Sequence, residues 1–171
     1  YGLPAAIGAC FANGKKRVIC IEGDGSLQMN IQELQTLVHH NLPVKMFVLN
    51  NNGYLSIRMT QNNFFQGHYV ASGPENGVSC PDLSKISKAY GIPFVRMSNH
   101  QGLVGKIDEV LASPGPHIGE IMMDPDQSLV PKLSSIKLPD GRIVSKPLED
   151  MLPLLPRKEF KANMIVKTVN E

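Results

Sequence analysis

A carboxylate and an amide side chain stand directly after two hydrophobic runs of this sequence. Asp24 belongs to the segment GDGS at residues 23–26, which follows the run 17–22, and Asn51 follows the run 44–49. Carboxylate and amide oxygens are hard donors that suit Mg²⁺, which commonly keeps phosphate oxygens of a substrate among its ligands. Gly23 and Gly25 let the backbone approach a phosphate with no Cβ in the way. These residues therefore predict a magnesium–diphosphate site.

The two hydrophobic runs must position these side chains. Each run is short and mostly apolar, as buried strands of a parallel sheet are. In an open α/β sheet, ligands bind where strands end at their carboxyl edge. We therefore expect Asp24 and Asn51 to lie side by side at this edge. Ser26 would open the following helix, whose free N–H groups favour an anion.

The rest of the chain alternates between helical and strand patterns. Helices are expected at residues 4–12, 31–40, 83–90 and 101–111, and further strands at 93–97 and 117–123. This alternation predicts an α/β fold, a doubly wound, mostly parallel sheet with helices on both faces and right-handed crossovers. We assign residues 1–126 to this domain. Residues 127–171, which prolines interrupt repeatedly, are expected to form an extended C-terminal tail that packs on the domain or on a neighbouring subunit.

Two local features carry more detailed expectations. Asn30 followed by Glu33 predicts a capping box at the start of a helix, an assignment preferred over a catalytic role for Glu33. Residues 55–80 are polar and weakly periodic, which predicts a long loop with one or two helical turns. Long loops in compact domains are commonly functional, so this one is expected to shape a substrate pocket. Arg58 within it is expected at the surface, and a contact with a carboxylate or a phosphate is the alternative.

Longer stretches resemble one known family. GDGS followed by the pair Asn50-Asn51 resembles the thiamine diphosphate signature, and the stretches YGLPAAIGA and NIQELQTLVHHNLPVK match as well. Together they resemble the C-terminal, diphosphate-binding domain of acetolactate synthase-like enzymes. The resemblance implies the thiamine diphosphate-binding fold, thiamine diphosphate and Mg²⁺ as cofactors, and carboligation of a 2-keto acid substrate. FAD stays open as a further cofactor, because no residue here bears on it.

The resemblance also assigns roles to residues. It implies that Mg²⁺ is bound by the side chains of Asp24 and Asn51 and by the backbone carbonyl of Gly53. It places Gly25 and Ser26 against the diphosphate. The implied cofactor-binding set is Gly23, Asp24, Gly25, Ser26, Asn51, Gly53 and Tyr54. No catalytic residue can be assigned, because the glutamate that activates the cofactor in this family lies in an amino-terminal domain of a neighbouring subunit.

That domain is the expected partner. The chain begins at Tyr1 without a methionine, so we interpret it as a piece that works with a pyrimidine-binding domain of the same or a neighbouring subunit in a homo-oligomer. The alternatives are a split or non-catalytic thiamine diphosphate-binding subunit, a 2-keto acid decarboxylase, and an unrelated nucleotide-binding domain. A nucleotide-binding domain is disfavoured, because this sequence contains neither of the glycine-rich motifs GxGxxG and GxxxxGK(S/T).

Two positions depart from the family pattern. In a gapless alignment, the tryptophan that shapes the acceptor pocket of acetolactate synthases falls on Thr60. The glutamate of pyruvate decarboxylase-like enzymes falls on Ile57. The identity of the acceptor substrate is therefore not predicted.

Composition narrows the classes of partner. The 171 residues are 42% hydrophobic and carry a net charge of only +2, which gives no indication of a nucleic-acid partner. No apolar run approaches the roughly 18 residues of a membrane-spanning helix. The three cysteines are odd in number and show no CxxC spacing, which argues against a disulfide framework or a zinc site. We expect a cytoplasmic protein.

Overall fold

The computed structural model describes residues 1–168, without the side chains of residues 136 and 137. The chain forms two compact units, Tyr1–Asp126 and a second that begins at Gln127. None of the described helices is long and apolar enough to cross a bilayer.

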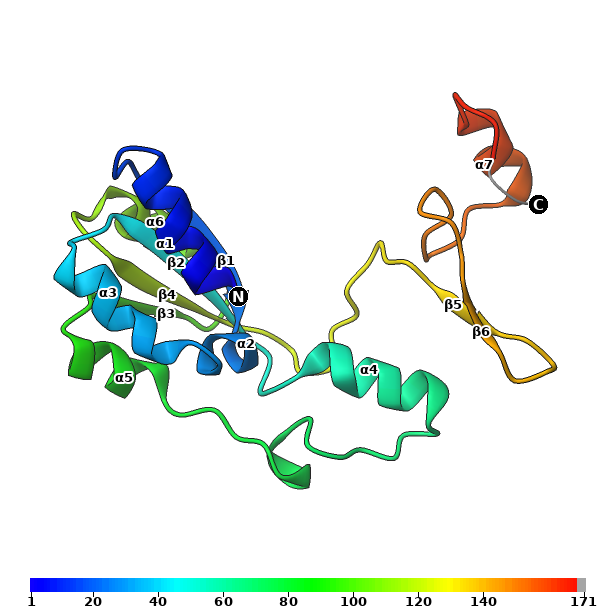
Figure 1. Ribbon diagram of the computed structural model, residues 1–171, viewed down its shortest axis with the longest axis horizontal. Helices are drawn as coiled ribbons and strands as arrows, with labels where there is room; N and C mark the ends of the chain where they lie inside the picture. The colour runs from blue at the N-terminus through cyan, green and yellow to red at the C-terminus, as the bar shows by residue number, and fades with distance from the viewer. Residues whose placement is uncertain (169–171) are drawn as a thin grey trace. The chain divides into compact units, whose positions relative to one another are not determined.

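The first unit is built on four parallel strands (Figure 1). They lie in the order β1-β2-β4-β3. The strands are β1 Val18–Gly23, β2 Val44–Asn50, β3 Phe94–Met97 and β4 His117–Met122. The helices are α1 Gly2–Ala12, α2 Asp24–Gln28, α3 Leu34–His39, α4 Leu55–Phe64, α5 Leu83–Tyr90 and α6 Leu103–Ala112, with short 3₁₀ turns η1 Ile31–Glu33 and η2 Pro74–Asn76. The prediction of a parallel α/β sheet is confirmed.

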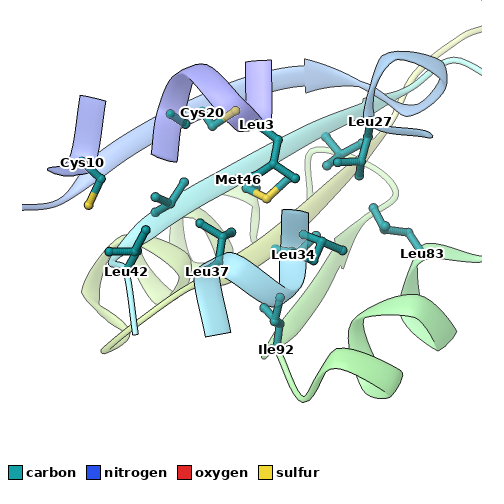
Figure 2. Packing of buried hydrophobic residues seen from close by; sticks show 14 residues of the cluster. Leu3, Cys10, Cys20, Leu27, Leu34, Leu37, Leu42, Met46, Leu83 and Ile92 are labelled. Carbon is teal, nitrogen blue, oxygen red and sulfur yellow. The ribbon is translucent and has the colours of Figure 1, made fainter. Parts of the chain in front are cut away.

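Helices cover both faces of the sheet. On one face, α1, α3 and α5 pack on the sheet, and Figure 2 shows Leu3 of α1 and Leu37 of α3 near Met46 of β2, and Leu83 of α5 near Leu27. The buried members of this cluster are Leu3, Ala6, Cys10, Cys20, Leu27, Leu34, Leu37, Leu42, Val44, Met46, Val48, Leu83, Ile92 and Ile118. On the other face, α6 contributes Val110, which packs with Phe47 and Met97. Burying each such large side chain contributes about 1.5–3 kcal/mol, so both layers hold the strands in place.

The register of the sheet brings the site segments together. Gly23 at the end of β1 pairs with Leu49 of β2. Asn50 at the end of β2 pairs with Met122 of β4. Because the strands are parallel, all three release the chain at one edge.

A buried carboxylate fixes α1 to the same edge. Glu22, at the end of β1, is only 8% exposed. Its carboxylate accepts hydrogen bonds from the backbone N–H groups of Gly2 and Leu3, both at 3.0 Å. These are among the N–H groups that a helix leaves unpaired at its start. Glu22 therefore links the start of α1 to the strand that carries Asp24.

Two local predictions are wrong. The segment expected as a loop with one or two helical turns contains the ten-residue helix α4. The expected capping box does not form, because Asn30 precedes a 3₁₀ turn and makes no side-chain cap. The Glu33 carboxylate instead accepts a hydrogen bond from the Thr36 hydroxyl at 2.8 Å.

The second unit contains short elements within the proline-interrupted segment. They are the antiparallel strands β5 Ser135–Lys137 and β6 Ile143–Ser145 and the helix α7 Arg157–Asn163. Asp150 accepts two hydrogen bonds from the Arg157 guanidinium, at 2.8 and 2.9 Å. The guanidinium holds the pKa of this carboxyl below its usual range.

Acid should destabilise this fold through His117, at the start of β4. The ring is 3% exposed, and its Nδ1 lies 2.9 Å from the Ser113 hydroxyl. Burial lowers the pKa of His117; Glu109 opposes this effect and Lys45 adds to it. Below the unfolded-state pKa of about 6.5, the unfolded chain binds a proton that the folded chain does not, so stability falls as pH falls.

We therefore expect the free energy of unfolding to decrease between pH 7 and pH 5, and to decrease less steeply in His117→Leu. Urea unfolding across this pH range measures both slopes. His100→Gln, at an exposed histidine, is the matched control and should keep the wild-type slope. Equal slopes in wild type and His117→Leu would contradict the assignment.

Candidate functional site

The predicted site residues meet at the carboxyl edge of the sheet. Asp24 is the first residue of α2, directly after β1, and Asn51 directly follows β2. Figure 1 shows α2 beside the segment that leads from β2 to α4. The Asp24 Oδ2 atom accepts a hydrogen bond from the Gly53 N–H at 2.9 Å. The two motifs are thus joined directly.

Two oxygens of this group are buried without a partner. Asp24 is only 5% exposed. Its Oδ1 atom and the Asn51 Oδ1 atom have no hydrogen-bond donor in the part of the chain that the structure describes. Leaving such groups unpaired is costly, so their burial indicates that a ligand completes them.

Gly53 adopts a backbone conformation that brings its peptide close to Asp24. Its φ is +124°, and a Cβ there would lie 2.6 Å from the Ser72 carbonyl oxygen. A Cβ on Gly25 would lie 3.1 Å from the Gly53 carbonyl oxygen and 2.7 Å from the Tyr54 ring. Both glycines are therefore needed for the two motifs to approach each other.

The helix after the first motif differs from the expectation. It begins at Asp24 rather than at Ser26, and it is only five residues long. A helix this short has only a small dipole to attract an anion. Ligand binding at this motif would therefore depend more on the Asp24 carboxylate and on the two glycines. A Cβ on Gly23 would meet only the Ser26 hydroxyl, at 3.9 Å, which leaves space beside Gly23 and Ser26 for an approaching group.

The adjacent asparagines have different surroundings. Asn50 Oδ1 accepts from the Asn52 N–H at 3.1 Å, and Asn50 Nδ2 donates to Glu120 Oε1 at 2.7 Å. Glu120 is 1% exposed and is also paired with Arg96. Asn50 therefore supports the loop, whereas Asn51 keeps a free oxygen. The sequence gives one indication of these contacts. Glu120 is the single acid in the mostly apolar strand HIGEIM, and a buried carboxylate needs a partner.

The surface position expected for Arg58 is wrong. Its guanidinium is partly buried and donates to four backbone carbonyl oxygens. These belong to Asn51, Asn52, Ser72 and Pro125. No local sequence pattern indicated these contacts.

Cys80 is a further neighbour of the site that sequence reasoning did not single out. Burial, followed by the negative charge of the neighbouring Asp24 carboxylate, raises the pKa of the Cys80 thiol to about 11. The group is therefore a neutral thiol at physiological pH.

A cleft of about 470 Å³ borders the same loop. The residues lining it are Asn52, Arg58, Tyr69, Gly73, Pro74, Glu75, Asn76, Pro125 and Asp126. Six of these residues, at positions 58, 69 and 73–76, belong to the segment 55–80 that is expected to shape a substrate pocket.

The oxygen atoms that could bind a metal ion at the sheet edge have one chemical character. They are a carboxylate, a side-chain amide and a backbone carbonyl, from Asp24, Asn51 and Gly53. Among the described residues, no group of three or more His, Cys, Asp or Glu side chains could hold a metal ion. An oxygen-only set of this kind fits Mg²⁺ better than it fits Zn²⁺.

The sequence of the first unit matches one family along almost its whole length. Residues 1–121 match the family described as "Thiamine pyrophosphate enzyme, C-terminal TPP binding domain". The chain belongs to this thiamine pyrophosphate enzyme family. Its fold and its paired motifs agree with that membership.

Curated relatives of the thiamine pyrophosphate domain are acetolactate synthases. The chain is 36% identical over 134 residues to the acetolactate synthase large subunit of Cyanidium caldarium. It is 37% identical over 139 residues to acetolactate synthase 2, chloroplastic, of Zea mays, and 33% identical over 139 residues to the Nicotiana tabacum protein of the same name. These matches cover 78–79% of this chain but only 21–23% of each relative.

The chain therefore contains a thiamine pyrophosphate-binding domain similar to the matching part of acetolactate synthases, and it spans less than a quarter of the length of these curated relatives. Thiamine pyrophosphate and thiamine diphosphate are two names for the same cofactor.

Proposed function

We propose that this chain binds the diphosphate of thiamine diphosphate through Mg²⁺ as part of a 2-keto acid carboligase. The observation that carries the proposal is the pair of buried, partnerless oxygens on Asp24 and Asn51. The Gly53 N–H donates to the other oxygen of Asp24, which joins the Asn51–Gly53 segment to the first motif. A divalent cation would satisfy both oxygens at once.

Each residue would have a separate task. Asp24 would supply the negative charge that draws the cation into a buried place. Asn51 Oδ1 and the Gly53 carbonyl would add neutral oxygens, and Gly23, Gly25 and Ser26 would lie against the diphosphate. Tyr54, whose ring occupies the space next to Gly25, would hold the two motifs at the correct spacing.

The bound cofactor would stabilise the carbanion that forms when a 2-keto acid loses CO₂. The residues of this chain would anchor and orient it. We assign none of them as an acid or base in the reaction. A pyrimidine-binding domain of the same or a neighbouring subunit in a homo-oligomer would complete the site.

Residues of α4 bear on the second substrate. Thr60 is exposed, and its hydroxyl donates to the Ser56 carbonyl within the helix at 3.0 Å. In the proposed enzyme, Thr60 would present a methyl group to the acceptor, which is the second carbonyl substrate. The aligned residue of acetolactate synthases is a tryptophan, which presents an indole. A wider acceptor pocket follows from this proposal.

Titration calorimetry tests the metal–diphosphate assignment. We expect the complete native protein to bind thiamine diphosphate with Mg²⁺ and to lose this affinity in excess EDTA. Thiamine monophosphate should bind much more weakly, because it lacks the second phosphate. Equal affinity with Mg²⁺ and with EDTA would refute a cation-mediated site.

A further inference from the structure

The Arg58 side chain joins three segments at the carboxyl edge of the sheet. Its Nη2 atom donates to the carbonyl oxygens of Asn51 at 2.7 Å and Pro125 at 2.9 Å. Its Nη1 atom donates to those of Asn52 at 3.2 Å and Ser72 at 3.0 Å. The segments are the loop after β2, the loop after α4 and the chain after β4.

Arg58 and Asp24 hold the same peptide unit from opposite sides. Peptide bonds are planar and trans, so the C=O of one residue and the N–H of the next point in opposite directions. Arg58 holds the Asn52 carbonyl, and the Gly53 N–H of that peptide donates to Asp24 Oδ2. The orientation of this peptide therefore depends on Arg58 as well as on Asp24.

The preceding peptide is held in the same way. Arg58 holds the Asn51 carbonyl, and the Asn52 N–H of that peptide donates to Asn50 Oδ1. Two successive peptide planes are thus fixed at both ends. Asn51, whose side-chain oxygen has no partner among the described residues, and Gly53 stand at the two ends of this fixed stretch.

We propose that Arg58 is a positioning residue for the metal–diphosphate site: it orients the Asn51–Gly53 backbone so that the Asn51 side chain and the Gly53 carbonyl present their oxygens together with Asp24. This inference rests on the proposed function. Arg58 touches neither cation nor diphosphate in this role, and it acts through the backbone that it holds.

The guanidinium group suits this task, and an ammonium group does not. A guanidinium presents its donors in a rigid planar fork, whereas lysine has one nitrogen at the end of a flexible chain. Four carbonyls from three segments require donors on two separate nitrogens. Arg58→Lys therefore keeps the charge and loses the geometry.

The test compares Arg58→Lys with a variant of the same helix. Gln61 lies one turn further along α4, and its Nε2 donates to the Val70 carbonyl at 2.8 Å. It thus ties α4 to the following loop without touching the Asn51–Gly53 segment. Gln61→Met is the matched control for a loss of α4 stability.

Calorimetry on the complete native protein measures the Mg²⁺ concentration that half-saturates thiamine diphosphate binding, at a temperature below the unfolding of every variant. Arg58→Lys should raise this concentration about 10–100-fold, the usual effect of losing a residue that orients metal ligands. In Gln61→Met, the half-saturating Mg²⁺ concentration should stay within about twofold of the wild-type value, because this contact is separate from the Asn51–Gly53 segment.

The outcomes separate the two proposals. Absence of Mg²⁺-dependent binding in the wild-type protein would overturn the proposed function and, with it, this role for Arg58. Normal wild-type binding with unchanged half-saturation in Arg58→Lys would overturn the positioning role alone. Equal weakening in Arg58→Lys and Gln61→Met would also overturn it, since the effect would then come from the stability of α4.

Discussion

Asp24→Asn is expected to lower Mg²⁺-dependent affinity for thiamine diphosphate by at least about 100-fold. The substitution keeps the shape of the side chain and removes its charge. Asp24 is buried, and one of its oxygens has no partner among the described residues. Removing one member of a buried charge pair costs about 3–5 kcal/mol, and each 1.4 kcal/mol is a factor of ten in affinity. Titration calorimetry with the complete native protein gives the value.

Two further variants test whether charge is the cause. Asp82→Asn alters an exposed aspartate that caps α5, and it should leave cofactor affinity unchanged. Asn51→Asp added to Asp24→Asn returns one negative charge to the site and should recover part of the lost affinity. Full affinity in Asp24→Asn alone would rule out Asp24 as a metal ligand.

The sheet and the position of the site followed from the sequence because both depend on short-range patterns. Buried parallel strands are mostly apolar, and the predicted runs 17–22 and 44–49 correspond to β1 and β2 within one residue at each end. Once the strands are parallel, their carboxyl ends share an edge. Asp24 and the Asn51–Gly53 loop are joined there by a hydrogen bond.

Helix α4 could not be predicted in the same way. Its sequence LSIRMTQNNF is rich in residues with modest helix propensity and buries only Leu55. Tertiary contacts hold it instead, through Arg58 to Asn51, Ser72 and Pro125 and through Gln61 to Val70. The partner at Pro125 is 67 residues away in sequence, beyond any local pattern.

The supporting residues of the site were missed for the same reason. Glu120 and Asn50 are separated by 70 residues, and Cys80 reaches Asp24 only in the folded chain. A motif identifies the groups that contact a ligand, because those groups are clustered in sequence. The residues that orient them come from whichever segments the fold brings alongside.

Gly53→Ala is expected to destabilise the fold and to abolish thiamine diphosphate binding. Two independent costs arise at this position. The φ of +124° is strained for any residue with a Cβ, and the added Cβ would lie 2.6 Å from the Ser72 carbonyl oxygen. That oxygen cannot easily move, because it accepts hydrogen bonds from the Tyr54 N–H and from Arg58.

Gly77→Ala separates these two costs. Gly77 has a comparable φ of +107°, but its Cβ position has no atom within 4 Å. We expect Gly77→Ala to lose about 1–2 kcal/mol of unfolding free energy from backbone strain alone. Gly53→Ala should lose a further 1–3 kcal/mol or so from the steric overlap, measured by urea unfolding of both variants. Equal losses of unfolding free energy in the two variants would mean that the loop at Ser72 moves to make room for the new Cβ. The cofactor affinity of Gly53→Ala would then show whether the Gly53 carbonyl can still act as the proposed metal ligand.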